Sequence, residues 1–214
     1  MSVFDTINEL RSFKTGGEKT IPRKTMGKIL ESGRQAPSPG NVQSLEFIVV
    51  ESEQKKHVLA DATGDERFEN APTAVIVLAD VDRMSRKVGK HEAQDACSSE
   101  AGCAVQNMRL TAREEDISSC WVTGFDKVSV SNSFTIPEEK SPMAIVSFCY
   151  SNSEYKKPDR FGMNSVVFYD EYGNQIANMF DNLQWKGFRD NKKTAKKKGA
   201  SIKQKLSEIK DEYL

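Results

Sequence analysis

Two cationic clusters are the residues of this sequence that are best suited to binding chemistry. The segment LRSFK contains Arg11, Ser12 and Lys14 just after the first apolar helical pattern. An arginine binds phosphate oxygens through a planar fork and a serine adds a neutral donor, so this trio suits a phosphate. The segment KKPDRFG adds Lys157 and Arg160 beside a proline. Taken singly, each cluster is also typical of a solvent-facing surface.

A stiff polar loop comes directly before the first apolar strand, in the stretch RQAPSPGNVQSLEFIVV. Five consecutive residues of this loop are of turn-forming or polar type: Pro37, Ser38, Pro39, Gly40 and Asn41. Proline fixes its own backbone and removes a donor, while glycine adopts angles that other residues avoid. The loop is therefore held in one geometry, and it either turns a corner or grips a ligand.

Several common catalytic motifs are absent from the sequence. There is no G-x-G-x-x-G after a strand pattern, no G-x-x-x-x-G-K-[ST] and no G-x-S-x-G, so a Rossmann dinucleotide site, a P-loop and a hydrolase elbow are unsupported. The two histidines, His57 and His91, match no zinc spacing, and we expect no metal site. The cysteines form no C-x-x-C pair, and we expect four free, buried thiols. They are Cys97, Cys103, Cys120 and Cys149.

Composition bounds the class of protein. The 214 residues fit one domain, or one domain with an appendage. Lys and Arg total 31 and Asp and Glu total 31, so no global charge favours nucleic acid or an anionic membrane. No apolar run approaches the roughly 18 to 20 residues that span a bilayer, and the start MSVFDTINELRS lacks the blocks of a signal peptide. We therefore expect a cytoplasmic protein with neither a nucleic-acid nor a membrane partner.

The elements that must position the polar motifs mix helices and strands. Apolar spacing predicts helices at residues 3–10 and after Pro22, a small helix near 53–60, a long helix rich in small residues at 92–115 and a short helix before Pro137. The pattern of apolar runs predicts strands at 46–50, 74–79, 118–122, 143–150 and, last, SVVFYD at 165–170.

The C-terminal segment has a different composition. Between Lys186 and Lys205 there are nine Lys or Arg residues and one acid, Asp190. Like-charge runs of this kind favour a solvated, partly flexible extension that ends in a helix. An RNA-binding arm and a lid or packing arm on a partner subunit are the alternatives.

The order of the motifs resembles the FMN-dependent nitroreductase family over residues 3 to about 173. The motifs are LRSFK, RQAPSPGNVQSLEFIVV, NAPTAVIVLAD, DACSSEAGCAVQNMRLTA, SSCWVTGFD, PMAIVSFCY and KPDRFGMNSVVFYDEYG. The resemblance implies an α+β fold with a mostly antiparallel central sheet flanked by helices. It also implies an intertwined homodimer with two FMN molecules at the subunit interface. We thus expect an FMN-binding domain at 1–173 and a helical, Lys-rich extension at 174–214.

The resemblance implies a flavin-binding role for the cationic residues. Arg11, Ser12 and Lys14 would contact the phosphate, the ribityl chain and the pyrimidine edge of FMN. Arg160 would take the place of a phosphate-binding cation, and Arg67 would supply a cation near the pyrimidine edge.

The resemblance also implies that two uncharged segments contact the cofactor. The loop of residues 37–41 would lie along the flavin, with Asn41 and Gln43 reaching the cofactor of the other subunit. Thr123 and Gly124 would bring backbone N–H groups close to the redox-active ring nitrogen.

Two positions depart from the family pattern. Leu10 stands where the family often carries a second arginine, which removes one possible phosphate contact. The family's glycine-rich turn before the SCW motif reads EEDISS here, so the sequence leaves the geometry of that turn open.

With FMN bound, the expected chemistry is oxidoreduction. NADH or NADPH would give hydride to the flavin, which would pass electrons to a nitroaromatic, a quinone or a similar small acceptor, so no acid or base side chain is needed as a catalyst. A low-turnover flavin protein for storage or sensing is the alternative, and an RNA-associated basic protein is a third hypothesis. A dehydrogenase of heterocycles, a dehalogenase or a flavin-fragmenting enzyme also stays open within the enzyme class.

Overall fold

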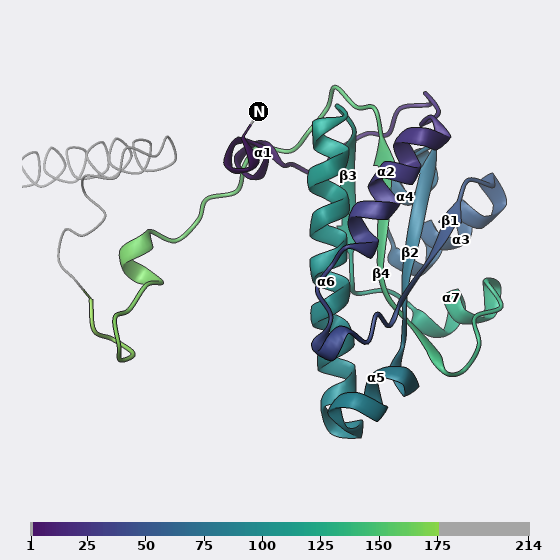
Figure 1. Ribbon diagram of the computed structural model, residues 1–214. Helices are drawn as coiled ribbons and strands as arrows, with labels where there is room; N and C mark the ends of the chain where they lie inside the picture. Colours follow the sequence, from purple (N-terminus) through teal and green to yellow (C-terminus); the bar gives the residue numbers. More distant parts are fainter. Residues whose placement is uncertain (1, 176–214) are drawn as a thin grey trace, which may run out of the picture. The chain divides into compact units, whose positions relative to one another are not determined.

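The computed structural model describes residues 2–175 and divides the chain into two compact units, Met1–Lys157 and Pro158–Leu214. The first unit contains the sheet and its helices (Figure 1). In chain order its elements are α1 (Val3–Glu9), α2 (Arg23–Arg34), the 3-10 turn η1 (Pro39–Asn41), β1 (Leu45–Val50), α3 (Glu53–Thr63), α4 (Arg67–Asn70), β2 (Thr73–Asp80), α5 (Val81–Val88), α6 (Lys90–Glu114), β3 (Ser118–Val122), α7 (Lys127–Ser133) and β4 (Lys140–Cys149).

The four strands form one antiparallel sheet in the order β1-β2-β4-β3. This confirms the predicted α+β fold with an antiparallel central sheet. The register defines two ends of the sheet. At one end Leu45, Ala79 and Ser141 lie side by side, and towards the other end Ala74 lies opposite Ser147. The chain therefore enters β1 at the end that is opposite to the start of β2.

Helices cover both faces of the sheet, and each face has its own apolar core (Figure 1). On one face Ile29 of α2 and Met108 of α6 are fully buried in the first core. On the other face Leu59 of α3, Phe68 of α4 and Val130 of α7 are fully buried in the second. Each such side chain contributes about 1.5–3 kcal/mol by leaving water. Of the residues predicted to face inward on the second helix, Met26 and Ile29 are buried and Leu30 is partly buried.

The helix α6 confirms the prediction of a long helix that is rich in small residues. It leads into the turn before β3, where the sequence lacks the family's glycine. There Asp116 adopts a left-handed conformation with φ 58°, and the N–H of Ile117 donates to the carbonyl of Ala112 at 2.9 Å. Aspartate tolerates this conformation better than most residues do, so the EEDISS segment still makes a tight turn into β3.

The prediction of a strand at residues 165–170 is wrong. In the described part of the second unit the chain forms the 3-10 turn η2 (Met163–Ser165), and the N–H of Val167 donates back to the carbonyl of Met163 at 3.0 Å. The N–H of Tyr169 donates to the carbonyl of Asn174 at 2.8 Å. These backbone groups are used in local turns, so an apolar run is not sufficient for a strand when no strand pairs with it.

One of the four cysteines also differs from expectation. All four are free, and Cys97, Cys120 and Cys149 are buried as predicted, but Cys103 is exposed on α6. Small residues surround it in sequence, yet its position on the helix points away from the core.

Two expectations lie partly or wholly outside the described residues. The Lys-rich stretch from 186 to 205 is among the residues that are not described, and the domain bounds 1–173 and 174–214 stay predictions. Within residues 2–175, no helix is long and apolar enough to cross a membrane. No group of three or more His, Cys, Asp or Glu residues in that part of the chain could hold a metal ion.

Candidate functional site

The LRSFK segment lies against the chain that leaves β4. Phe13 forms an isolated antiparallel bridge with Glu154, and the N–H of Tyr155 donates to the carbonyl of Ser12 at 3.0 Å. The two glycines that follow approach backbone carbonyls closely: a Cβ on Gly16 would lie 2.2 Å from the oxygen of Asn70. Only glycine permits such an approach. The segment is thus held at the end of the sheet where β2 begins and β4 ends, which we call the cationic end.

Arg67 of α4 joins this segment from another part of the chain. Its Nε and Nη2 donate to the carboxylate of Asp65 at 2.5–3.0 Å, and its Nη1 donates to the carbonyl of Phe13 at 3.2 Å. The Arg67 guanidinium carbon lies 5.5 Å from the ring centre of Tyr155, and the Lys14 ammonium lies 5.6 Å from the same ring. Lys14, Arg67 and Tyr155 therefore form one group, which we call the cationic group.

The ion pair between Arg67 and Asp65 determines the net charge at the cationic group. The hydrogen bonds from Arg67 hold the pKa of Asp65 below its usual value, and Asp65 in turn raises the pKa of Arg67. A guanidinium has five N–H donors, and three of those of Arg67 are used. Two donors of Arg67 and the exposed ammonium of Lys14 are left for a ligand oxygen, with a net charge of one positive unit across Lys14, Arg67 and Asp65.

Arg11 and Ser12 complete the cationic end. Arg11 is half-buried, and its Nη1 donates to the neighbouring carbonyl of Leu10 at 2.6 Å. Among the described residues no carboxylate pairs with Arg11. Its charge is available to an anion, and its predicted contact with a phosphate stays a prediction.

The PSPGN loop is closed on itself at the opposite end of the sheet. The N–H of Gln43 donates to the hydroxyl of Ser38 at 3.0 Å, and the N–H of Asn41 donates to the carbonyl of Ser38 at the same distance. Gly40, Asn41 and Gln43 all have positive φ, between 54° and 58°. A Cβ on Gly40 would lie 2.2 Å from the Lys87 side chain of α5. Pro37 and Pro39 thus belong to a compact loop whose exposed residues include Asn41 and Gln43.

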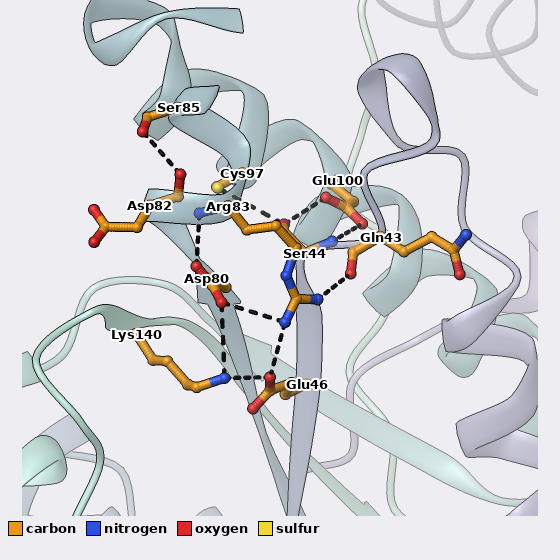
Figure 2. A network of polar contacts seen from close by, with 10 residues as sticks. All are labelled: Gln43, Ser44, Glu46, Asp80, Asp82, Arg83, Ser85, Cys97, Glu100 and Lys140. Carbon is orange, nitrogen blue, oxygen red and sulfur yellow. Dashed lines mark hydrogen bonds and ion pairs between the residues drawn. The ribbon is translucent and has the colours of Figure 1, made fainter. Parts of the chain in front are cut away.

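A network of polar contacts holds the loop to the sheet and to α6 (Figure 2). Arg83 of α5 donates from Nη1 to the carbonyl of Gln43 at 2.9 Å and pairs with Asp80 at 3.3 Å. The next residue, Ser44, is fully buried and donates to the carboxylate of Glu100. We call this side of the sheet, with residues 38–44 and their contacts, the loop end.

Thr123 and Gly124 follow β3 and are exposed. The strand ends opposite the middle of β4, where Val122 pairs with Ile145. A Cβ built on Gly124 would meet no atom within 4 Å, so the space beside it is open. The N–H of Asp126 then donates to the carbonyl of Ala62 at 2.9 Å, which fixes the exit of the segment.

The structure brings some of the predicted site residues together and separates others. Lys14 and Arg67 lie beside the same ring, that of Tyr155, at the cationic end, and Arg11 and Ser12 belong to the segment that is held there. The loop from Pro37 to Gln43 lies at the other end, beyond the five residue steps of β2 between Ala74 and Ala79, which span about 17 Å. Arg160 belongs to the second unit, so its predicted role stays a prediction.

Sequence reasoning missed several residues of the site. Tyr155 is an aromatic residue between two cations, and Asp65 stands two positions before Arg67, a spacing that suits a local ion pair. Arg109 of α6, which gave no signal in the sequence, contacts β3 and not the cationic group. Its Nε donates to the hydroxyl of Ser119 at 3.2 Å, its guanidinium lies 5.8 Å from the ring centre of Trp121, and burial lowers its pKa.

Comparison with known proteins identifies the family. The model of the nitroreductase family matches residues 11–66 and 54–150. The chain therefore belongs to the nitroreductase family, as the resemblance implied. A protein of Archaeoglobus fulgidus, provisionally named NADH dehydrogenase/NAD(P)H nitroreductase, is 28% identical over 164 residues, which cover 73% of this chain and 91% of that protein.

Solved structures share the fold. A Clostridium acetobutylicum protein, provisionally named NADH oxidase, matches with a TM-score of 0.69 and 26% identity over 78% of this chain and 100% of that one. An FMN-dependent nitroreductase of Clostridium difficile matches with a TM-score of 0.69 and 22% identity over 79% of this chain and 99% of that one. The sheet and helices described above are thus the nitroreductase fold.

Proposed function

We propose that this chain is an FMN-dependent oxidoreductase that passes hydride from NADH or NADPH through the flavin to a nitroaromatic, a quinone or a similar acceptor. The family membership and the relatives that are named for NADH or NAD(P)H support an oxidoreductase. The fold shared with an FMN-dependent nitroreductase supports the cofactor.

The residues present suit FMN. The cationic end offers Arg11 and Ser12 for a phosphate, and Lys14 and Arg67 for the pyrimidine edge of a flavin ring, whose carbonyl oxygens accept hydrogen bonds. The open space beside Gly124 leaves room for a flat ring against the backbone. When bound, FMN supplies the acceptance and donation of hydride.

The separation of the two ends carries the proposal that the protein acts as a homodimer. In one chain the loop end is about 17 Å along the sheet from the cationic end, by the rise of a β-strand. Two antiparallel copies would place the loop of each beside the cationic group of the other, giving two equal sites. The exposed apolar residues of α1 also favour a covering partner: Val3 is 66% exposed and Ile7 48%.

Each end has a distinct task in this arrangement. Lys14 and Arg67 would hold the pyrimidine edge of the flavin and supply positive charge that favours its reduced form. The loop would present Asn41 and Gln43 to the flavin in a fixed geometry, and its stiffness would limit the entropy lost on binding. No side chain of the chain is assigned a proton transfer.

The purified protein tests the proposal directly. We expect a yellow dimer that bleaches within seconds when mixed anaerobically with NADH or NADPH and that regains its colour on addition of a quinone. Bound flavin that does not bleach would favour the storage or sensing alternative. A colourless monomer that takes up no added FMN would contradict the proposal.

Hybrid dimers test whether the two ends of different chains share one site. One chain would carry Lys14→Ala with Arg67→Ala, and the other Asn41→Ala with Gln43→Ala, each with a different affinity tag. If the site is shared, one site of the hybrid has both defects and the other has none, so we expect one tightly bound FMN per dimer. If each site were built from one chain, both sites would be defective and tight binding would be lost.

A further inference from the structure

Glu100 is a buried carboxylate in the middle of α6 that has no cation beside it. Its side chain belongs to a residue that is 3% exposed, and among the described residues no Lys, Arg or His forms an ion pair with it. A buried carboxylate without a cation costs stability unless hydrogen bonds satisfy it. Such a residue is expected where the hydrogen bonds that it makes are needed.

Both carboxylate oxygens of Glu100 accept hydrogen bonds from one residue, Ser44. The backbone N–H of Ser44 donates to Oε1 at 3.1 Å, and its hydroxyl donates to Oε2 at 2.6 Å (Figure 2). The carbonyl of Ser44 accepts from the N–H of Asp80 at 2.9 Å. All polar groups of Ser44 are therefore used, and its position is determined by α6 and β2 together.

Ser44 is the last residue of the segment that contains the PSPGN loop, directly before β1. The preceding residue, Gln43, is held by Arg83 at its carbonyl and by Ser38 at its N–H. Three residues of the loop have positive φ, which for the two non-glycine residues, Asn41 and Gln43, is a strained backbone conformation. A strained loop keeps its geometry only where its ends are fixed, and the contact between Ser44 and Glu100 fixes one end of this loop.

We propose that Glu100 is a positioning residue, which fixes the loop of residues 38–44 for the flavin of the partner chain by holding the N–H and hydroxyl of Ser44. The inference rests on the proposed function. Glu100 and Ser44 are both buried, so neither touches a ligand. They act through Asn41 and Gln43, which are exposed.

Two substitutions of Glu100 separate positioning from core stability. Glu100→Met keeps the volume but leaves the buried N–H of Ser44 without an acceptor. Glu100→Gln keeps both contacts, because the amide oxygen can accept from the Ser44 N–H while the amide nitrogen donates to the hydroxyl. We expect Glu100→Met to speed amide exchange at Asn41–Ser44 about tenfold and to raise the Kd for FMN about tenfold, and Glu100→Gln to stay within about threefold of the wild type.

A third variant covers the case in which Glu100→Met fails to fold. Ser44→Ala removes only the hydroxyl contact, so we expect exchange of the same amides to rise about threefold. Ser98→Ala is the control, because Ser98 is an exposed serine of α6 whose hydroxyl donates to Gln94, and it should change neither quantity.

The outcomes are distinct. The inference is overturned if amide exchange in the loop and FMN affinity in Glu100→Met both stay within twofold of the wild type. Where Glu100→Met does not fold, the same result in Ser44→Ala overturns it. Equal losses in Glu100→Gln and Glu100→Met would also overturn it. If the wild-type protein takes up no FMN, the proposed function fails, while the exchange rates in the variants still decide whether Glu100 fixes the loop.

Discussion

The two ends of the sheet are held by similar devices. At the cationic end Arg67 binds the carboxylate of Asp65 and the backbone carbonyl of Phe13. At the loop end Arg83 binds the carboxylate of Asp80 and the backbone carbonyl of Gln43. Each arginine thus fixes a segment for which the family resemblance implies flavin binding.

The difference lies in what surrounds each arginine. At the cationic end Lys14 and Tyr155 are exposed, so charge and an aromatic face are open to a ligand. At the loop end the decisive contact, between Ser44 and Glu100, is buried. In the proposed site, the cationic end would supply charge to the flavin and the loop end would supply a fixed backbone shape.

Arg67→Ala should break the cationic end most strongly. It removes a fork of donors and leaves Asp65 as an unpaired carboxylate near the ligand, so we expect the Kd for FMN to rise about 100-fold. Titration of the apoprotein with FMN, followed by flavin fluorescence, measures the change.

Arg83→Ala is the matched variant at the loop end. It removes the same kinds of contact, but none to the ligand, so we expect a rise of only about threefold in the same titration. Equal losses for the two variants would contradict the division between charge and shape.

Lys14→Ala should weaken FMN binding by about tenfold, because the Lys14 charge is exposed and screened by water. It should also lower the reduction potential of the bound flavin by about 30 mV, since a nearby positive charge favours the more electron-rich form. Spectroelectrochemistry measures the potential. Lys19→Ala is the control, because Lys19 also lies over a tyrosine, 4.1 Å from the ring centre of Tyr150. An unchanged potential in Lys14→Ala would remove the assigned role.

Much of the fold could be predicted because its signals are local. The four strands of the sheet and the long helix α6 are marked by apolar runs and by small residues, and the boundaries agree within a few residues. The run at 165–170 has the same composition, yet it forms turns. A strand depends on a neighbour that pairs with it, and no pattern within the run itself contains that information.

The candidate site could be predicted in parts but not as an arrangement. The sequence motifs identify Lys14 and the PSPGN loop as candidates. The distance between them depends on the register of β1 and β2, which cannot be predicted from the motifs. Glu100 was missed because a glutamate within a helix is usually solvent-exposed, and only its burial next to Ser44 sets it apart. Tertiary contacts, and not residue types, distinguish such positions.

Gly40→Ala should strain the loop end. The left-handed conformation costs an alanine about 1 kcal/mol, and the added methyl also displaces the flexible end of Lys87. We expect the free energy of unfolding in urea to fall by about 1–2 kcal/mol, and Lys87→Ala in the same chain to restore only the part due to the contact. Gly27→Ala in α2 is the opposite control, because it has open space in a helix and should stabilise the protein by about 0.5–1 kcal/mol. No loss in Gly40→Ala would show that the loop relaxes freely.

The smallest expected effect concerns a titratable contact at the cationic end. His57 of α3 contacts Glu69 of α4 at 3.2 Å, and this hydrogen bond, with a weaker attraction to Asp61, raises the pKa of His57. Because the folded pKa lies above the unfolded value, the attraction between α3 and α4 is fully present below about pH 6.5 and is lost as the pH rises through the folded pKa. An NMR titration of the imidazole should show a lower pKa in Glu69→Gln and a smaller decrease in Asp61→Asn. The amide signals of Asn41 to Ser44 should not respond over this range, because the contacts that anchor the loop contain no histidine. A response there would mean that the two ends are coupled through the sheet and are not independent halves.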